Sequence, residues 1–201
     1  MITKKKLAIE LSKLDLDRVL DASLEQYDTP SEIAAELLWY AHMQGAIENR
    51  SVVDLGCGSG ILGKGALLLG AREVYFVDVD ENAISLAKKN VSEKNAFFER
   101  MDVVDFDGKH NTVIMNPPFG VQVRKADKAF LRKAFKVSKE IFSIHKRESG
   151  KFIDGLIKDT GFEVMNVVDF KLMLKKTYDF HKQDKRYVSV GAWHLKKEGF
   201  K

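Results

Sequence analysis

The sequence predicts an α/β fold built on a doubly wound, mostly parallel sheet of seven strands. Three observations lead to this prediction. Short apolar runs alternate with helical patterns through the centre of the chain, polar residues or glycines follow each central run, and two late apolar runs have no helical pattern between them. The alternation predicts parallel pairing through right-handed crossovers. The two late runs predict an antiparallel hairpin at one edge of the sheet, and helices are expected ahead of the sheet.

Length and composition are typical of one soluble domain over residues 1–201. The chain has 45% hydrophobic and 31% charged residues, and it has no apolar run of transmembrane length. The N-terminus shows no apolar signal region, so we expect a cytoplasmic protein. A single cysteine, Cys57, excludes an internal disulfide and a cysteine-based zinc cluster. The histidines are scattered along the chain, so no metal site is expected.

Residues 1–50 are expected to form a helical extension that completes the ligand pocket. A second helix is expected over residues 31–44, because Thr29 suits an N-cap, Pro30 suits the first helical position and Glu32 would complete a capping box. The polar residues just before this helix either line a ligand pocket or only cap the helix. They are Gln26, Tyr27 and Thr29.

The central and C-terminal elements follow from the hydrophobic pattern and its punctuation. Asp80 is expected to cap one helix, and Gly70 and Gly161 are expected to end two others. The expected strands are residues 51–55, 73–79, 97–101, 112–115, 141–144, 164–174 and 187–195. The expected helices between them are residues 61–69, 81–92, 127–139 and 149–159.

Polar residues stand at the ends of four successive strands, where parallel sheets bind their ligands. The first strand carries Asp54 and leads into alternate glycines, which let a ligand approach the backbone at a helix N-terminus. Asp78 follows eighteen residues after Gly60 and would accept the hydroxyls of a ribose. Asp102, beside the Val103 N–H, would accept from an adenine amine. This pattern predicts a nucleoside ligand. Its Gly-x-Gly-x-Gly spacing lacks the pyrophosphate turn of dinucleotide folds, which favours S-adenosylmethionine over NAD.

The fourth strand ends in Asn116-Pro117-Pro118-Phe119-Gly120. The two prolines cannot continue a sheet, so they form a stiff turn that presents an amide, free carbonyls and an aromatic ring. The exocyclic amine of adenine is planar and a poor nucleophile until its hydrogens are held. The Asn116 side-chain oxygen and the Pro117 carbonyl would each accept one of them, and Phe119 would stack on the base. The alternative is a proline-rich turn with Phe119 in the core.

These residues carry a resemblance. The run Asp54-Leu55-Gly56-Cys57-Gly58-Ser59-Gly60, then Asp78, then the Asn-Pro-Pro-Phe turn is similar to class I S-adenosylmethionine-dependent methyltransferases, which have a Rossmann-like fold. Five further segments resemble the methyltransferase-like protein 5 family over nearly the whole chain: Leu24–Thr29, Val113–Gly120, Ala129–Leu131, Ser143–Lys146 and Tyr178–Lys182. Ser59 stands where some members carry cysteine, and Asp28 where some carry proline.

The resemblance implies an adenine-N6 methyltransferase that acts on small-subunit ribosomal RNA. It implies catalytic roles for Asn116, Pro117, Pro118 and Phe119. It implies cofactor contacts by Gln26, Thr29, Gly56, Ser59, Ile61, Asp78, Asp102 and Val103. The residue pattern adds Tyr27, Asp54, Gly58 and Asn116 to the expected cofactor site.

Charge is uneven along the chain. Residues 121–151 hold ten lysines and arginines against three acids, and residues 171–201 hold nine against three. A basic surface beside a nucleoside site predicts a polyanionic substrate, whereas ordinary solvated helix faces are the alternative. The residues expected to bind RNA are Lys125, Lys128, Arg132, His181, Lys182, Lys185 and Arg186.

Two other functions remain open from the sequence. One is a different Asn-Pro-Pro enzyme that methylates DNA adenine, guanine-N2 or a protein glutamine. The other is a non-catalytic RNA-binding scaffold. The resemblance also implies a small zinc-binding activator subunit. The expected edge strand Phe97–Met101 carries two adjacent phenylalanines, which would offer a partner a strand to pair with unless both are covered within the chain.

Overall fold

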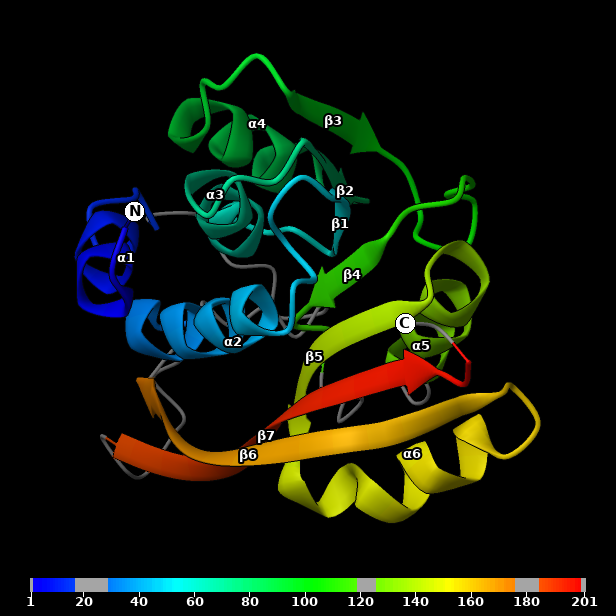
Figure 1. Ribbon diagram of the computed structural model, residues 1–201. Helices are drawn as coiled ribbons and strands as arrows, with labels where there is room; N and C mark the ends of the chain where they lie inside the picture. Colours follow the sequence, from blue (N-terminus) through cyan, green and yellow to red (C-terminus); the bar gives the residue numbers. More distant parts are fainter. Residues whose placement is uncertain (1, 17–28, 119–125, 176–184, 200–201) are drawn as a thin grey trace.

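The computed structural model describes residues 2–16, 29–118, 126–175 and 185–199 (Figure 1). Within this part of the chain, the strands form a single seven-stranded sheet in the order β3-β2-β1-β4-β5-β7-β6. Neighbours from β3 to β5 are parallel, and β7 pairs antiparallel with both β5 and β6. The predicted fold class is therefore confirmed. The strands are β1 (Ser51–Leu55), β2 (Glu73–Asp78), β3 (Ala96–Arg100), β4 (Thr112–Met115), β5 (Glu140–Lys146), β6 (Phe162–Lys175) and β7 (Lys185–Lys197).

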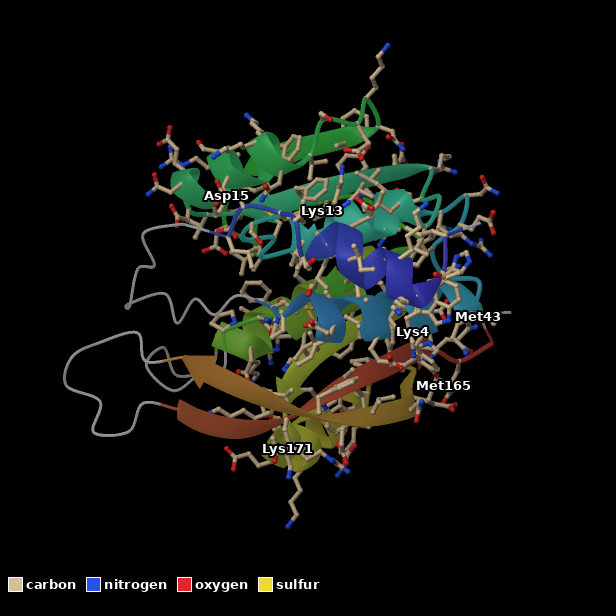
Figure 2. All side chains as sticks on the ribbon, turned by 90° about the vertical axis from the view of Figure 1, so that its left-hand side faces the viewer. Lys4, Lys13, Asp15, Met43, Met165 and Lys171 are labelled. Atoms are coloured by element: carbon tan, nitrogen blue, oxygen red, sulfur yellow. The ribbon has the colours of Figure 1, made fainter. Side chains whose placement is uncertain are left out.

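Helices cover both faces of the sheet, because strand residues alternate between two apolar clusters. Val52 and Ile114 belong to the cluster with helices α1 to α4, whereas Val53 and Val113 belong to the cluster with α5 and α6. Figure 2 shows α1 and α2 beside each other on the near side of the molecule. The helices are α1 (Lys4–Leu11), α2 (Ser31–Met43), α3 (Ile61–Leu68), α4 (Glu81–Asn90), α5 (Ala126–Val137) and α6 (Gly150–Ile157). None of these described helices is long and apolar enough to cross a bilayer.

The strand register brings the predicted site residues to one edge of the sheet. Leu55, the last residue of β1, lies opposite Val77 of β2 and Met115 of β4. Met115 lies in turn opposite Ser143 of β5. The glycine turn, the end of β2 and the Asn-Pro-Pro turn therefore share the carboxyl edge of the parallel strands, which is the edge where such sheets bind ligands.

The β6–β7 hairpin extends past β5 at this same edge. Lys146, the last residue of β5, pairs with Val190, yet the two hairpin strands continue to pair as far as Lys175 and Lys185. Lys171, on the extended part of β6, is exposed, and its side chain points away from the molecule in Figure 2. The predicted antiparallel hairpin thus forms a two-stranded arm beside the site.

One local prediction is wrong. Thr29 does not cap α2: the N-cap residue is Pro30, and no side chain accepts a capping hydrogen bond there. The expected capping box with Glu32 is absent, and Glu32 accepts from the Ser31 hydroxyl instead. The Thr29 hydroxyl accepts from the Asn116 side chain, a residue far along the sequence. By contrast, Asp80 caps α4 as predicted, because its carboxylate accepts from the Asn82 N–H.

Candidate active site

The turn between β1 and α3 places backbone close to where a ligand must lie. Gly56, Gly58 and Gly60 have φ values of 69°, 54° and 81°, in the left-handed region that favours glycine. The Gly56 N–H donates to the Val77 carbonyl at 2.8 Å, which ties the turn to the end of β2. A Cβ on Gly56 would come within 2.7 Å of the Phe130 ring on α5. The first glycine is therefore required for packing as well as for conformation.

Asp54 lies beneath this turn and is almost fully buried. Its carboxylate accepts from the Gly63 N–H in the first turn of α3 at 2.8 Å. Burial raises the pKa of Asp54 well above its ordinary value; the Gly63 N–H opposes this shift and the nearby Asp78 charge adds to it. Asp54 thus holds the start of α3 against β1. Its predicted contact with the cofactor stays a prediction.

Asp78, the last residue of β2, has a carboxylate fixed by the backbone on both sides. Oδ2 accepts from the Gly58 N–H at 2.9 Å, and Oδ1 accepts from the Asp80 N–H at 3.0 Å. The side chain is 8% exposed, at the edge where β1 and β2 part. A carboxylate oxygen has room for more than one donor. These two bonds fix the Asp78 carboxylate at the end of β2, and its contact with ribose hydroxyls stays a prediction.

The loop after β3 carries Asp102 and Val103 and is fastened to α5. Asp102 Oδ1 accepts from the Val104 N–H at 3.0 Å, which closes a local turn around the buried Val103. Lys133, a buried lysine on α5, donates from Nζ to the Phe106 carbonyl at 2.5 Å. Sequence reasoning missed Lys133, because nothing in a basic helical pattern distinguishes an inward lysine from a solvated one.

Asn116 stands immediately after β4, with its amide held by its nitrogen. Nδ2 donates to Thr29 Oγ1 at 2.9 Å. The amide oxygen, Oδ1, is buried and has no hydrogen-bond partner. Buried polar atoms are nearly always paired, so an unpaired acceptor calls for a functional explanation. Pro117, which follows, is buried and supplies a carbonyl at the same strand end.

A residue outside every predicted motif connects the N-terminal region to the glycine turn. Asn90, the last residue of α4, donates from Nδ2 to the Ser59 carbonyl at 2.9 Å and to the Asp15 carbonyl at 2.8 Å. Its Oδ1 accepts from the Asp15 N–H at 3.0 Å. The chain just before residues 17–28 is thus held beside Ser59. No local sequence signal marks Asn90, whose partners lie 31 and 75 residues away.

Some predicted site residues lie outside the described part of the chain. These are Gln26, Tyr27, Phe119, Lys125, His181 and Lys182. Lys128 and Arg132 lie on α5, where Arg132 is exposed and Lys128 partly exposed. Lys185 and Arg186 lie on β7, opposite Lys175 and Leu174 of β6. The arm and α5 therefore carry the described members of the predicted RNA-binding set.

His145 lies near the end of β5, two residues after Ser143, which pairs with Met115, the residue before Asn116. Burial lowers its pKa from 6.5 to about 3, so its ring is neutral near pH 7 and is a weak base. A neutral-pH acid–base role for His145 is therefore disfavoured. The described residues also contain no group of three or more histidine, cysteine, aspartate or glutamate side chains placed to hold a metal ion.

The residues present fit S-adenosylmethionine. The glycine turn, with three glycines in the left-handed region, leads directly into the N-terminus of α3 at the carboxyl end of β1. Asp78 ends β2, eighteen residues after Gly60, close to the spacing typical of a ribose-binding acid, and Asp102 and Val103 follow β3 at the same edge. This arrangement, a nucleoside site across the strand ends with an amide acceptor beside it, is typical of one class of protein. That class is the class I S-adenosylmethionine-dependent methyltransferases.

Comparisons with known proteins identify the family. The family model for the methyltransferase small domain matches residues 23–144, and the chain belongs to this family. It is 32% identical to the rRNA N6-adenosine methyltransferase Mettl5 of Drosophila melanogaster, over 86% of each protein. It is 34% identical to METTL5 of Danio rerio, over 83% of this chain and 86% of the relative. A proposed RNA methyltransferase from Pyrococcus horikoshii has a similar solved structure, with 40% identity, a TM-score of 0.91 and 98% of each chain covered.

Proposed function

We propose that this chain transfers the methyl group of S-adenosylmethionine to the exocyclic N6 amine of an adenosine in small-subunit ribosomal RNA. The observation that carries the mechanism is the buried, unpaired Asn116 Oδ1 at the carboxyl end of β4. The enzyme class and the RNA substrate agree with relatives named as rRNA N6-adenosine methyltransferases that match most of the chain. We further propose that residues 1–201 act as one domain in the cytoplasm, with residues 1–50 completing the cofactor pocket.

The chain's own residues act by holding and orienting. When bound, S-adenosylmethionine supplies an electrophilic methyl group on a sulfonium. Asp78 and the glycine turn hold the nucleoside end of the cofactor, and Asp102 accepts from its adenine amine. Asn116 Oδ1 and the Pro117 carbonyl would accept hydrogen bonds from the two hydrogens of the target amine, so that the nitrogen lone pair is released from the ring and can attack the methyl group. One of these hydrogens must then leave as a proton, because the methylated amine keeps only one. Phe119 stacks on the target base, which must be unpaired or flipped out of a helix.

Removal of the amide tests this mechanism. Asn116→Ala should bind S-adenosylmethionine with wild-type affinity in calorimetry, because the amide acts on the substrate amine. Methyl transfer should fall by about 100- to 1000-fold, the usual cost of one preorganised group in an active site. Wild-type turnover in this variant would exclude Asn116 as the acceptor.

The substrate is tested separately with labelled cofactor and whole ribosomal subunits. Nucleoside mass spectrometry should find N6-methyladenosine in small-subunit RNA. Label in N2-methylguanosine would favour another Asn-Pro-Pro enzyme, and label in protein would favour a glutamine methyltransferase. Absence of cofactor binding in calorimetry would favour the scaffold.

We propose that RNA lies across α5 and the β6–β7 arm. Arg132 on α5 and Lys171 on the arm are exposed, and the arm extends past β5 at the same edge as Asn116. Exposed cations on two elements beside the site suit the phosphates that flank a target nucleotide. Lys171 is an addition to the predicted set. Besides Arg132, that set contains Lys128 on α5, Lys185 and Arg186 on β7, and Lys125, His181 and Lys182, which lie outside the described residues.

We also propose that β3 receives a small zinc-binding activator subunit. β3 is an edge strand and is only five residues long. Phe97 is 43% exposed and stacks on Tyr75 with ring centroids 5.0 Å apart. Phe98 is partly buried on the other face against Phe76, so one of the two rings is covered within the chain. Backbone pairing along β3 with Phe97 as an anchor would suit strand addition.

Two lysine substitutions distinguish this edge from core. Phe97→Lys should leave the isolated protein folded and abolish co-purification with the subunit, whereas Phe98→Lys should destabilise the monomer, because its ring packs against the core. Retained co-purification with folded Phe97→Lys would place the partner elsewhere.

A further inference from the structure

Helix α2 is hydrogen-bonded to β4 near both of its ends. Just before the helix, Thr29 Oγ1 accepts from Asn116 Nδ2 at 2.9 Å, at the carboxyl end of β4. Beyond its other end, the Ala46 carbonyl accepts from Thr112 Oγ1 at 2.6 Å, at the amino end of β4. Between these contacts, most apolar side chains of α2 are buried in the core, so the helix is a rigid support for the strand that carries Asn116.

The Thr29 hydroxyl is committed to this contact. Thr29 is 6% exposed and precedes the N-cap residue Pro30, and no side chain caps the helix. A threonine before a helix ordinarily satisfies the free N–H groups of the first turn. Here it serves a side chain 87 residues away instead.

Which atom of the Asn116 amide faces the substrate decides what the side chain can do. An asparagine amide has a donating and an accepting end of nearly the same shape. The target amine donates hydrogen bonds, so it needs the amide oxygen as the acceptor. The amide nitrogen in that position would place one donor against another. In this structure the nitrogen is held by Thr29, and the oxygen is the buried atom without a partner.

We infer that Thr29 is a positioning residue for methyl transfer: it holds the Asn116 amide by its nitrogen and so directs Oδ1 to the target amine. This inference rests on the proposed role of Asn116. It assigns to the helical extension an effect on the rate of transfer that is separate from any contact of Thr29 with the cofactor. The expected signature is a loss of kcat that persists when cofactor and RNA are both saturating.

Thr29→Val removes the hydroxyl and keeps the shape of the side chain. We expect kcat to fall by about three- to tenfold, the factor that one neutral hydrogen bond commonly contributes. Thr29→Ser restores the hydroxyl and should recover most of the rate. A Thr29→Val variant with wild-type kcat and only a weaker cofactor affinity in calorimetry would overturn the inference.

Thr112→Val is the matched control, because it removes the other hydrogen bond between α2 and β4. It should lower the unfolding midpoint and leave kcat unchanged. An equal loss of kcat in Thr112→Val and Thr29→Val would mean that general loosening of α2 is responsible, and would overturn the inference.

A double-mutant cycle and a spectrum test the coupling directly. In single-turnover assays, Thr29→Val should cost nothing further in an Asn116→Ala background, because its effect passes through the amide. In the NMR spectrum of ¹⁵N-labelled protein, the side-chain amide signal of Asn116 is assigned by its absence from Asn116→Ala. This signal should shift in Thr29→Val and keep its position in Thr29→Ser. Additive rate losses or an unshifted amide signal would contradict positioning. Normal turnover by Asn116→Ala would contradict the proposed role of Asn116 itself. Normal turnover by Thr29→Val, with loss of activity in Asn116→Ala, would leave the role of Asn116 intact and contradict only the role of Thr29.

Discussion

Single side chains near the glycine turn owe their roles to backbone partners that lie 2 to 20 residues away in the sequence. Asp54 and Asp78 both follow apolar strand residues and look equivalent in the sequence, yet one carboxylate turns inward to Gly63 and the other stays at the edge with Gly58 and Asp80. The pattern of residues predicted both acids at the sheet edge. It could not predict which of the two carboxylates would turn inward, because that depends on the N–H groups that the folded turn presents to each.

Asp78 is the side chain whose loss should weaken cofactor binding most. Asp78→Ala should reduce affinity at least tenfold in calorimetry, since charge-assisted hydrogen bonds contribute about 1.5–3 kcal/mol each. Asp80→Ala is a matched control: it removes the cap of α4 and should cost about 1 kcal/mol of stability without affecting affinity. Unchanged affinity in Asp78→Ala would rule out the ribose contact.

His145 predicts a specific pH dependence of stability. Its pKa is near 6.5 when unfolded and about 3 when folded, so the unfolded chain binds an extra proton between these values. Stability should therefore fall as the pH drops from about 6.5 towards 3, with a contribution of up to about 1.4 kcal/mol per pH unit. Denaturant titrations of wild type and His145→Asn should differ in this slope. Parallel pH profiles would show that His145 titrates normally in the folded protein.

Two buried side chains, Thr29 and Lys133, show which contacts could not be predicted from the sequence. The Thr-Pro-x-Glu run satisfies the local rules for a capping box, and the prediction is wrong because the hydroxyl accepts from Asn116 instead. Local rules contain no information on a partner 87 residues away. Lys133 looks like one more solvated lysine of a basic helix, whereas its amine donates to the Phe106 carbonyl in the loop after β3.

Elements were predictable where the hydrophobic period is clear. The predicted strand 112–115 and helix 61–69 match β4 and α3 to within one residue. The predicted strand 141–144 is shorter than β5. The first and last residues of β5 are the charged Glu140 and Lys146, and the hydrophobic pattern places charged residues outside a buried strand. The hairpin was predicted, but the position of β7 between β5 and β6 is a property of pairing and has no local signal.

The elements at the C-terminal side of the sheet are joined to α2 by a buried polar chain. His194 of β7 contacts the Tyr40 hydroxyl with Nδ1 at 3.2 Å and Glu140 Oε1 with Nε2 at 2.8 Å. The His194 ring also stacks on Phe142 with centroids 4.3 Å apart. These contacts connect the helical extension to β5 and β7 at Glu140, the first residue of β5. Asn116 lies at the other edge of the sheet, where the parallel strands end.

Tyr40→Phe should therefore lower stability and leave catalysis intact. Loss of one neutral hydrogen bond costs about 0.5–1.5 kcal/mol, and somewhat more if the His194 nitrogen stays unpaired. The free energy of unfolding from denaturant titration measures the loss, and kcat with saturating RNA measures the rate. A fall in kcat without a fall in stability would contradict a purely structural role for this chain of contacts.

At the scale of the whole molecule, the described residues contain the two basic elements that we propose to bind RNA and no separate recognition domain. Charge reversal at Arg132, Lys171 and Arg186 should raise the RNA dissociation constant. It should also flatten the dependence of binding on salt, by about 0.7–0.9 units of slope for each phosphate that the protein no longer neutralises. The control is reversal of Lys4 and Lys13, in and just after α1, which packs on the sheet face opposite α5; these lysines pair with Glu36 and Glu10. An unchanged slope after the first reversal would leave these residues as ordinary solvated charges.

The place of β7 in the sheet also constrains how the chain assembles. β7 is the last strand in the sequence, yet it lies inside the sheet, with β5 on one side and β6 on the other. As the chain is synthesised, β5 and β6 are complete before the strand that must join them exists. Closing this gap fixes contacts between residues up to 56 positions apart in one step, such as Glu140 with Lys196. The arm that we propose to bind RNA is therefore expected to be among the last parts of the newly made enzyme to form.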